Sequence, residues 1–520
     1  MTWIHPLSPA VEETSNEETP SVLGGKGHGL VVLRRLELPV PPGFVISTAA
    51  CRAFLRAGRF PDGLTAELAA AVSTLQTTTR RRLGGPERPL AVSVRSGGSV
   101  SMPGMMDTIL NLGLTTATTA QLAADTGDVR FALDSRLRFL TGYASAVIGL
   151  APEMLEAATR EEKNPTDAIR AVEALIRERA GEPVPDDPMR QLEAAIRSVF
   201  SSWDTPRART YRELNGIPHD LGTAVTVQAM VFGNRDDRSG TGVAFSRDPN
   251  TGERAPFGEV LFGRQGEDVV SGRSMTRPLP ELAEREPAVW AGLLQAMNRI
   301  EEHYRDACYV EFTYESGELW LLQVRTGGLV GRAAVRVAVD LADEGVISRR
   351  EALLRVSPKD LQYTDTPRIE ISESLDILTR GLGACPGVAT GRVATTADQA
   401  ARMAADGPVV LVRPQTSPLD MHGLAAAAGI LTASGGPASH AAVVARAMGK
   451  PAVVGAADLT VDAASACVRV AGRTVPEGTL ITIDGTGGEV AIGTPRIVTA
   501  PPDPHLHRLR EWADATLTDR

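Results

Sequence analysis

The sequence predicts a mixed α/β (α+β) fold, and three stretches of the chain carry that prediction. Residues 90–95 alternate in the manner of a half-buried strand. Residues 115–215 place apolar side chains at helical spacing, most clearly in 130–140 and 191–200. Residues 429–449 predict a short apolar strand, a glycine-rich turn and a helix. A chain of 520 residues and 55.0 kDa is long enough for two or three such domains.

The composition is that of an ordinary globular protein, with 43% hydrophobic and 22% charged residues. A net charge of −9 and a pI of about 5.6 exclude the basic surface that nucleic-acid binding needs. No apolar run is long enough to span a bilayer and the first residues lack a signal-peptide pattern, so we expect no membrane association and a cytoplasmic location. The cysteines, at positions 51, 308, 385 and 467, form no CxxC pair, which argues against a zinc cluster or a disulfide scaffold.

Two glycine-rich stretches near the start of the chain have the composition of phosphate-binding segments. Lys26 lies in Leu-Gly-Gly-Lys-Gly-His-Gly-Leu, where glycines let the backbone and the ammonium group approach a phosphate. The spacing is not that of a Walker A loop, and a solvated lysine beside a flexible turn is the alternative interpretation. Arg95 ends a predicted strand and could bind phosphates bidentately. The mobile loop expected after it, through residue 104, includes Gly97, Gly98 and Ser99.

Residues 308–325 predict a β-hairpin with a Ser-Gly turn. Period-two geometry puts Tyr309 and Glu311 on one face of the first strand, and Gln323 and Arg325 on one face of the second. A carboxylate and an amide oxygen that converge there suit Mg²⁺, which prefers hard oxygen ligands and bridges nucleotide phosphates. Arg325 would neutralise charge on a transferring phosphate.

The predicted strand, turn and helix at 429–449 carry the most specific chemical signal. Ser439 is a good N-cap and Gly449 suits the left-handed position that ends a helix, so His440 falls in the first helical turn. Free N–H groups and the positive end of the helix dipole lower the pKa of a histidine there and stabilise an attached phosphoryl group. On this local chemistry alone, a histidine held by a neighbouring carbonyl is the competing interpretation.

The run Gly-Gly-x-x-Ser-His-Ala-Ala-Val-Val-Ala-Arg at 435–446 resembles the phosphohistidine signature of the pyruvate phosphate dikinase family. The segments around Lys26 and Arg95, and the strands from 223 to 325, resemble the nucleotide-binding domain of the same family. The resemblance implies an ATP-grasp domain, in which two lobes hold ATP between them. It also implies that His440 takes a phosphoryl group from ATP and carries it to a second site.

The resemblance further implies the partners of several residues. Gln228 and Met230 would lie near the adenine, and Lys26, Arg95 and the loop that begins at Gly97 would hold the triphosphate. Mg²⁺ is the implied cofactor, with Glu311 and Gln323 as its ligands. Arg325 would act with His440 and Arg95 in the transfer.

The sequence departs from the family in two respects. The family usually has an acidic residue where Tyr309 stands, and a tyrosine cannot replace a carboxylate on magnesium near neutral pH. Either Glu311 and Gln323 suffice, or metal handling is altered, or the site is degenerate. The sequence also stops after a proline-rich stretch and a helix, where the family continues into a barrel that binds pyruvate and phosphoenolpyruvate. We therefore expect the donor and carrier parts of the enzyme only.

These observations predict four segments. Residues 1–355 form an ATP-grasp nucleotide-binding domain with a helical insert at 115–215, and residues 356–382 form a linker. Residues 383–494 form a phosphohistidine carrier domain, and 495–520 a proline-rich linker with a C-terminal helix. A carrier histidine must leave the nucleotide site to meet its acceptor, so we expect a semi-rigid tether and a swivelling domain.

The implied function is an ATP-dependent phosphotransferase of the dikinase type. Phospho-His440 would form from the β-phosphoryl group, leaving AMP, while the γ-phosphoryl group goes to inorganic phosphate or water. The acceptor in trans would be a small molecule or a peptide. One alternative is a subunit of a split pyruvate phosphate dikinase whose pyruvate/phosphoenolpyruvate barrel is a separate protein. A second, non-enzyme alternative is a degenerate nucleotide-binding or scaffold protein.

Overall fold

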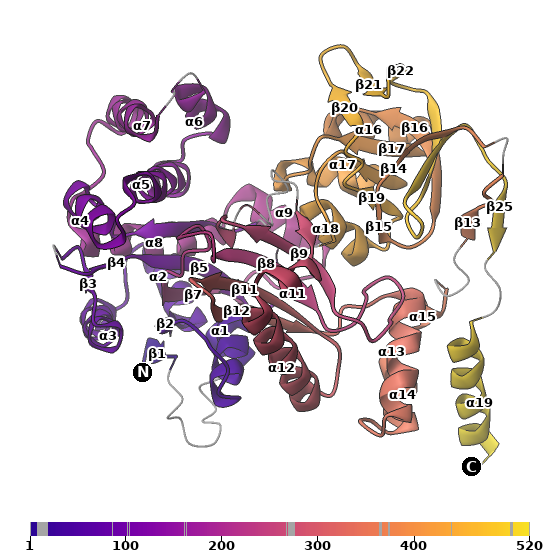
Figure 1. Cartoon of the computed structure of the whole chain (residues 1–520), viewed down its shortest axis with the longest axis horizontal. Coiled ribbons are helices and arrows are strands. Elements are labelled where there is room, and N and C mark those ends of the chain that lie inside the picture. The colour runs from indigo at the N-terminus through magenta and orange to yellow at the C-terminus, as the bar shows by residue number, and fades with distance from the viewer. Residues whose placement is uncertain are drawn as a thin grey trace. The chain divides into compact units, whose positions relative to one another are not determined.

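The computed structural model of the chain mixes helices and strands throughout, which confirms the predicted α/β class (Figure 1). It forms two compact units, residues 1–231 with 320–323 and residues 232–319 with 324–520. The structure describes residues 2–7, 19–85, 87–100, 102, 105–160, 162, 164–266, 268, 276–362, 367–372, 375–437, 439–499 and 503–518. No helix among these described residues is both long enough and apolar enough to cross a membrane.

The first unit is built on an antiparallel sheet in the order β1-β2-β7-β5-β6. Apolar side chains from neighbouring strands, such as Phe44, Val94 and Val227, contribute to one core. The strands are β1 (Ile4–Pro6), β2 (Gly43–Ile46), β5 (Val92–Gly98), β6 (Thr108–Leu112) and β7 (Thr223–Ala229), with a separate pair β3 (Arg82–Leu83) and β4 (Pro89–Leu90). The helices of the N-terminal part are α1 (Pro20–Arg35), α2 (Thr48–Ala57) and α3 (Leu64–Thr79).

Six α-helices and one π-helical turn follow β6 in the range where the spacing of apolar residues predicts helices. Polar residues begin several of them, as where the Asp128 side chain accepts a hydrogen bond from the N–H of Phe131. Their apolar faces join the core of the sheet, for example through Leu192 and Ile196. The elements are α4 (Thr116–Thr126), α5 (Val129–Tyr143), η1 (Ala144–Ile148), α6 (Pro152–Thr159), α7 (Pro165–Ala180), α8 (Pro188–Ser202) and α9 (Pro206–Leu214).

The second unit begins with a five-stranded lobe, a sheet in the order β10-β9-β8-β11-β12. Its strands are β8 (Gly240–Phe245), β9 (Phe257–Phe262), β10 (Arg277–Pro278), β11 (Cys308–Glu315) and β12 (Glu318–Thr326), and its helices are α11 (Glu281–Arg285) and α12 (Pro287–Tyr304). The predicted hairpin is confirmed as β11 and β12. Ser316 and Gly317 form its turn, both at positive φ, as a two-residue hairpin turn requires.

An eight-stranded domain, residues 377–492, follows in the order β14-β24-β23-β16-β17-β18-β19-β15. The strands β16 to β19 are parallel neighbours. The predicted strand, turn and helix at 429–449 are confirmed as β18 and α18. The elements are β14 (Ile377–Arg380), β15 (Leu382–Cys385), β16 (Val388–Ala394), α16 (Ala397–Met403), η2 (Ala404–Asp406), β17 (Val409–Arg413), η3 (Pro418–Asp420), α17 (Met421–Ala426), β18 (Gly429–Thr432), α18 (His440–Met448), β19 (Ala452–Val454), β20 (Leu459–Asp462), β21 (Cys467–Val470), β22 (Arg473–Pro476), β23 (Leu480–Asp484) and β24 (Glu489–Ile492).

The two segments predicted as linkers meet each other. Strand β13 (Pro367–Ile369) pairs with β25 (Ile497–Thr499), so the chain enters and leaves the eight-stranded domain through one two-stranded ribbon (Figure 1). The buried carboxylate of Asp484, on β23, accepts hydrogen bonds from Arg368 Nε at 2.9 Å and from the N–H of Ile369 at 3.0 Å. The ribbon is therefore fixed to the domain that it serves.

Three helices that precede the ribbon in the sequence and one that follows it form a helical layer. They are α13 (Gly331–Asp343), α14 (Arg349–Arg355), α15 (Pro358–Gln362) and α19 (Pro504–Thr518). Leu509 and Trp512 from α19 share a core with Val335 and Val339 from α13. Helices separated by more than 150 residues of sequence are thus joined by apolar packing.

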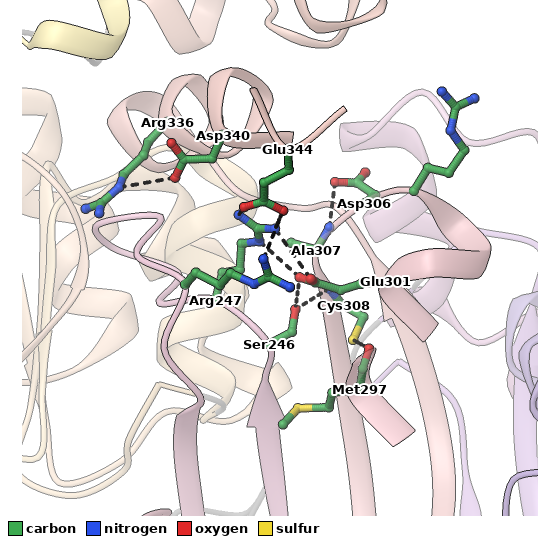
Figure 2. A network of polar contacts seen from close by, with 12 residues as sticks. Ser246, Arg247, Met297, Glu301, Asp306, Ala307, Cys308, Arg336, Asp340 and Glu344 are labelled. Atoms are coloured by element: carbon green, nitrogen blue, oxygen red, sulfur yellow. Dashed lines mark hydrogen bonds and ion pairs between the residues drawn. The ribbon is translucent and has the colours of Figure 1, made fainter. Parts of the chain in front are cut away.

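A buried ion-pair network joins the five-stranded lobe to the helical layer (Figure 2). Arg247 follows β8, and its guanidinium is fully buried, with Glu301 of α12 and Glu344 after α13 each 3.1 Å away. The hydroxyl of Ser246 also donates to Glu301, at 2.6 Å. Because a buried guanidinium needs most of its donors satisfied, this arrangement fixes the end of β8 against both helices.

One predicted loop begins later than the sequence suggests. Gly97 and Gly98 belong to β5 and pair with Ala224 and Thr223 of β7, although glycine favours loops in isolation. The glycine-rich segment around Lys26 likewise lies within α1, which bends at Gly24. Pairing with β7 and packing on β5 override the local preference in both places.

Candidate functional site

The predicted phosphate-binding residues of the first unit are brought together by close packing of α1 on β5. Gly24 has φ +67°, and a Cβ there would lie 1.7 Å from the carbonyl oxygen of Gly97, so only glycine fits. This contact sets Lys26 beside Gly97, where a Cβ on the glycine would lie 3.2 Å from the Cβ of Lys26. The half-buried Lys26 is thus positioned by the backbone of the strand that carries Arg95.

Arg95 is buried, and its guanidinium donates to two groups in its own unit. Nη2 donates to the side-chain oxygen of Gln228 at 2.5 Å and to the carbonyl of Leu322 at 3.0 Å. The amide nitrogen of Gln228 donates in turn to the carbonyl of Pro41, at 3.1 Å. The Gln228 amide therefore holds Arg95 through its oxygen and is itself held by Pro41 through its nitrogen, a role that the sequence did not suggest. The placement of Gln228 and Met230 near an adenine stays a prediction.

The segment after β5 is fixed at its far end by α8. The Asp107 carboxylate accepts a hydrogen bond from the Ser198 hydroxyl at 3.0 Å, and the N–H of Asp107 donates to the Ser202 hydroxyl at 3.3 Å. Burial raises the pKa of Asp107, and Ser198 and Arg207 oppose that shift. Ser99 is half-buried. Residues 101, 103 and 104 of the predicted loop lie outside the described residues.

In the second unit, the strand register places polar and aromatic side chains on one face of the lobe. Glu311 pairs with Val243, which pairs with Glu259, so two carboxylates lie on the same face two strands apart. In the next row, Tyr309 pairs with Phe245. The Tyr309 hydroxyl lies 3.3 Å from Oε1 of Glu311 and donates to it. The structure therefore brings Tyr309 and Glu311 into contact.

The second strand of the hairpin carries Gln323 and Arg325. Gln323 is buried and belongs to the first unit, whereas Arg325 is exposed in the second, with its guanidinium carbon 5.6 Å from the Tyr309 ring centroid. Within the described residues, no three His, Cys, Asp or Glu side chains group as a metal site. Mg²⁺ keeps several waters and binds through one or two carboxylates plus substrate phosphates, so the carboxylate of Glu311 has the chemistry that this ion needs.

His440 is the first residue of α18. The Ser439 hydroxyl accepts from the N–H of Ala442, and Gly449 ends the helix at φ +64°, as predicted. His440 Nδ1 lies 3.0 Å from the Thr416 hydroxyl, at hydrogen-bond distance. His440 Nε2 is covered and has no hydrogen-bond partner among the described residues. Burial lowers the pKa of this histidine to about 4.

The sequence does not indicate several residues that lie near His440. Thr416 precedes a 3₁₀ turn that Ser417 and Asp420 cap reciprocally, and Arg413 Nε lies 3.3 Å from Asp420. The Asp420 carboxylate partly opposes the lowering of the His440 pKa. The capping pattern Ser-x-x-Asp at 417–420 predicts this turn, but nothing local relates it to a histidine 20 residues later.

The eight-stranded domain contacts the five-stranded lobe at the turn before His440. A Cβ on Gly436 would lie 1.3 Å from Oε1 of Glu259, so this backbone approaches the carboxylate as only glycine allows. The amide of Asn250 donates to the carbonyl of Gly383 at 2.9 Å. Arg446 donates to the carbonyl of Pro437, and its guanidinium carbon is 5.9 Å from the Phe245 ring centroid.

The geometry supports a specific chemistry. A neutral imidazole at a helix N-terminus is nucleophilic and would be stabilised when it carries an anionic group. The cations Lys26 and Arg95 lie beside backbone N–H groups of β5, which suits polyphosphate. These residues have the chemistry that is needed to bind a polyphosphate and to accept a phosphoryl group.

Two family models match the chain. One, described as "Pyruvate phosphate dikinase, AMP/ATP-binding domain", matches residues 55–281. The other, described as "PEP-utilising enzyme, mobile domain", matches residues 405–488 and includes His440.

Curated relatives match nearly the whole chain. It is 43% identical over 542 residues to "Pyruvate, phosphate dikinase" of Rhizobium meliloti, covering 99% of this chain and 60% of that protein. It is 42% identical over 517 residues to "Pyruvate, phosphate dikinase 2" of Zea mays, covering 96% of this chain and 58% of that protein. For "Pyruvate, phosphate dikinase 1, chloroplastic" of Arabidopsis thaliana the identity is 41% over 518 residues, with 96% and 54% covered. The chain thus spans less than two thirds of the length of these relatives.

Proposed function

Because the chain belongs to the pyruvate phosphate dikinase family, we propose that it is an ATP-dependent phosphotransferase in which His440 accepts a phosphoryl group. The observation that carries the proposal is the state of His440 at the start of α18. Thr416 engages Nδ1, and Nε2 has no hydrogen-bond partner among the described residues. With the proton on Nδ1 and donated to Thr416, the Nε2 lone pair is free to attack phosphorus.

The group that would be transferred to His440 is the β-phosphoryl group of ATP. A bond forms between His440 Nε2 and the β-phosphorus, and the bond from that phosphorus to the oxygen of the α-phosphate breaks. AMP leaves with that oxygen. The γ-phosphoryl group goes to inorganic phosphate or water as its bond to the oxygen of the β-phosphoryl group breaks. The Nδ1 proton stays on the ring, so the phosphorylated imidazole is positioned by the same threonine. Such a phosphorylated imidazole is a good donor for a second transfer.

The nucleotide would be held mainly by the first unit. Lys26 and Arg95 would bind the triphosphate, together with backbone groups of Gly97, Gly98 and Ser99. Gln228 would act through Arg95, and Met230 would lie near the adenine. Glu311 and Gln323 would hold Mg²⁺, which supplies neutralisation of phosphate charge when bound. Arg325 would offset charge on the transferring group.

Labelling with ATP that carries ³²P in the β-position tests this function. Label is expected on the wild-type protein, with release of AMP, and is expected to vanish in His440→Ala. His422→Ala is the matched control, because His422 lies in the same domain, is exposed, and pairs with Asp398 at 2.7 Å. Equal labelling of His440→Ala and wild type would overturn the proposal.

We further propose that phospho-His440 passes its group to an acceptor in trans. The two matched domains are described as a nucleotide-binding domain and a mobile domain, which account for a donor and a carrier. A chase of the labelled protein with candidate small molecules and peptides, read by phosphorus NMR, identifies the acceptor. Transfer to pyruvate only when a separate barrel protein is added would favour the split dikinase.

A non-enzyme function is favoured by one observation, the tyrosine at position 309 beside Glu311. A nucleotide-binding or scaffold protein with a degenerate site would bind ATP without forming AMP. Measuring AMP release in the presence of Mg²⁺ and inorganic phosphate separates the two functions. AMP formation that depends on His440 would exclude the degenerate site.

A further inference from the structure

Tyr309 stands next to the carboxylate that would bind the cation, and its position is set by the strand. Tyr309 and Glu311 are separated by one residue of β11, so their side chains leave the same face of the sheet. The phenol hydroxyl lies 3.3 Å from Oε1 of Glu311. This contact joins two neighbouring side chains of one strand and therefore forms whenever β11 is folded.

The ring of Tyr309 is held on both sides. It packs against Phe245, its partner on β8, with ring centroids 4.9 Å apart and an interplanar angle of 61°. The guanidinium carbon of Arg325 is 5.6 Å from the ring centroid, from the neighbouring strand β12. These contacts are the favourable edge-to-face and cation–π arrangements, so the hydroxyl has a fixed direction.

Tyr309 is the donor of this contact. Its phenol hydroxyl donates through its proton, and a side-chain oxygen of Glu311 accepts. The contact therefore engages one of the two oxygens of Glu311.

From this geometry we infer that Tyr309 is a positioning residue for the cation that accompanies the nucleotide. Its hydroxyl donates to Oε1 of Glu311 and would leave Oε2 for the metal, so that one oriented carboxylate would serve at this position. The inference rests on the proposed function, since it assumes that Glu311 is a ligand. It assigns to Tyr309 a part in metal binding that does not require the tyrosine to touch the metal.

The expected size of the effect follows from the behaviour of groups behind metal ligands. Hydrogen-bond partners of ligating side chains typically change metal affinity 10- to 100-fold when they are removed. A hydroxyl that blocked a bidentate cation would have the opposite effect, because its hydrogen bond uses a lone pair of Glu311 that such a cation takes. Removing the hydroxyl then strengthens metal binding, so the sign of the change decides between the two roles.

The test uses the full chain and Mn²⁺ as the probe, with a non-hydrolysable ATP analogue bound. Mn²⁺ affinity is measured by electron paramagnetic resonance for wild type, Tyr309→Phe and Tyr314→Phe. Tyr314 is the matched control: it lies on the opposite face of β11, is fully buried, and its hydroxyl has no hydrogen-bond partner among the described residues. Phenylalanine keeps the ring and its packing in both variants.

The expected result is Mn²⁺ binding at least 10-fold weaker in Tyr309→Phe and unchanged in Tyr314→Phe. In Tyr309→Phe, the affinity for the analogue without a divalent cation and the unfolding temperature are expected to match those of the wild type. If Tyr309 had a purely structural role, these two quantities would change. Unchanged or stronger Mn²⁺ binding in Tyr309→Phe overturns the inference while the proposed function stands. A wild-type chain that binds neither the analogue nor Mn²⁺ overturns the proposed function and this inference with it.

Discussion

The imidazole of His440 shows how one hydrogen bond and burial together set the chemistry of a ring. Thr416 engages Nδ1, and burial lowers the pKa to about 4. A histidine with an ordinary pKa of about 6.5 would be largely protonated, and so non-nucleophilic, at pH 5.5. In this environment the ring stays neutral at that pH, so the nucleophile of the proposed transfer needs no separate base.

The first prediction concerns this neutrality. The initial rate of His440 phosphorylation, measured by the label from β-³²P-ATP in single turnover, is expected to change little between pH 8 and pH 5. The rate falls only as the pH approaches about 4, where the ring takes up a proton. An acid limb centred near pH 6.5 would contradict the prediction. Controls at each pH are ATP binding and the folded fraction, because the ATP phosphates and other carboxylates also titrate in acid.

The same pKa has a consequence for stability. The unfolded chain, with a histidine pKa of about 6.5, binds a proton before the folded chain does as the pH falls. The folded state therefore loses stability through this group as the pH falls below about 6.5, until it too is protonated near 4. His440→Asn, which cannot titrate, is expected to flatten this part of the pH profile of urea unfolding. An identical slope in both proteins would contradict the assignment.

At the scale of elements, the Arg247 network joins a strand end to two helices (Figure 2). Arg247→Met leaves the carboxylate of Glu301 buried without its cation, which costs about 3–5 kcal/mol of unfolding free energy. The double variant Arg247→Met/Glu301→Gln removes both charges and is expected to recover part of that loss. Urea unfolding of the second unit measures the loss of unfolding free energy in each variant. If the losses of the single variants add up to that of the double variant, the two residues are not coupled.

Arg59 provides the control for that experiment. Its ion pair with Asp62 has the same chemistry at 2.8 Å, but both side chains are largely exposed. Solvent and salt screen such a pair, so Arg59→Met is expected to leave the urea midpoint unchanged. The comparison separates burial from charge, because both variants remove one arginine from an ion pair.

Elements with local signals could be predicted from the sequence. Ser439 and Gly449 predict the ends of α18, and the Ser-Gly turn predicts the β11–β12 hairpin, because caps and turns depend on a few adjacent residues. The loop predicted at Gly97 and Gly98 was wrong, since pairing with β7 outweighs the low strand preference of glycine.

Contacts between distant residues could not be predicted. Thr416 is 24 residues from His440, and Asp484 is more than 100 residues from Arg368. Neither residue of each pair lies in a local sequence pattern that identifies its partner, because such contacts depend on the order of strands in a sheet. The roles of Lys26, Gln323 and the other predicted site residues stay predictions, since they need a bound nucleotide.

At the scale of the whole molecule, the helical layer is held together by its last helix. Trp512 is buried, with the guanidinium carbons of Arg349 and Arg508 at 5.4 and 5.6 Å from its ring centroid. Trp512→Ala is expected to cost about 3–5 kcal/mol in the unfolding of this layer. Leu354→Ala is the control, because Leu354 is 77% exposed on α14. Unfolding is measured by calorimetry. A transition temperature that shifts in both variants, or in neither, would contradict the assignment of Trp512 to the core of the helical layer.

The ribbon β13–β25 has a consequence for how the protein is made. The eight-stranded domain is one continuous stretch, so it can fold on the ribosome as soon as its own residues have emerged. The partners of α13 in the helical layer include α19, which is synthesised about 170 residues later. Until then the apolar face of α13, which includes Val335 and Val339, lacks its packing against α19. Biosynthesis therefore completes the eight-stranded domain before the helical layer, whose packing on α13 needs residues of α19.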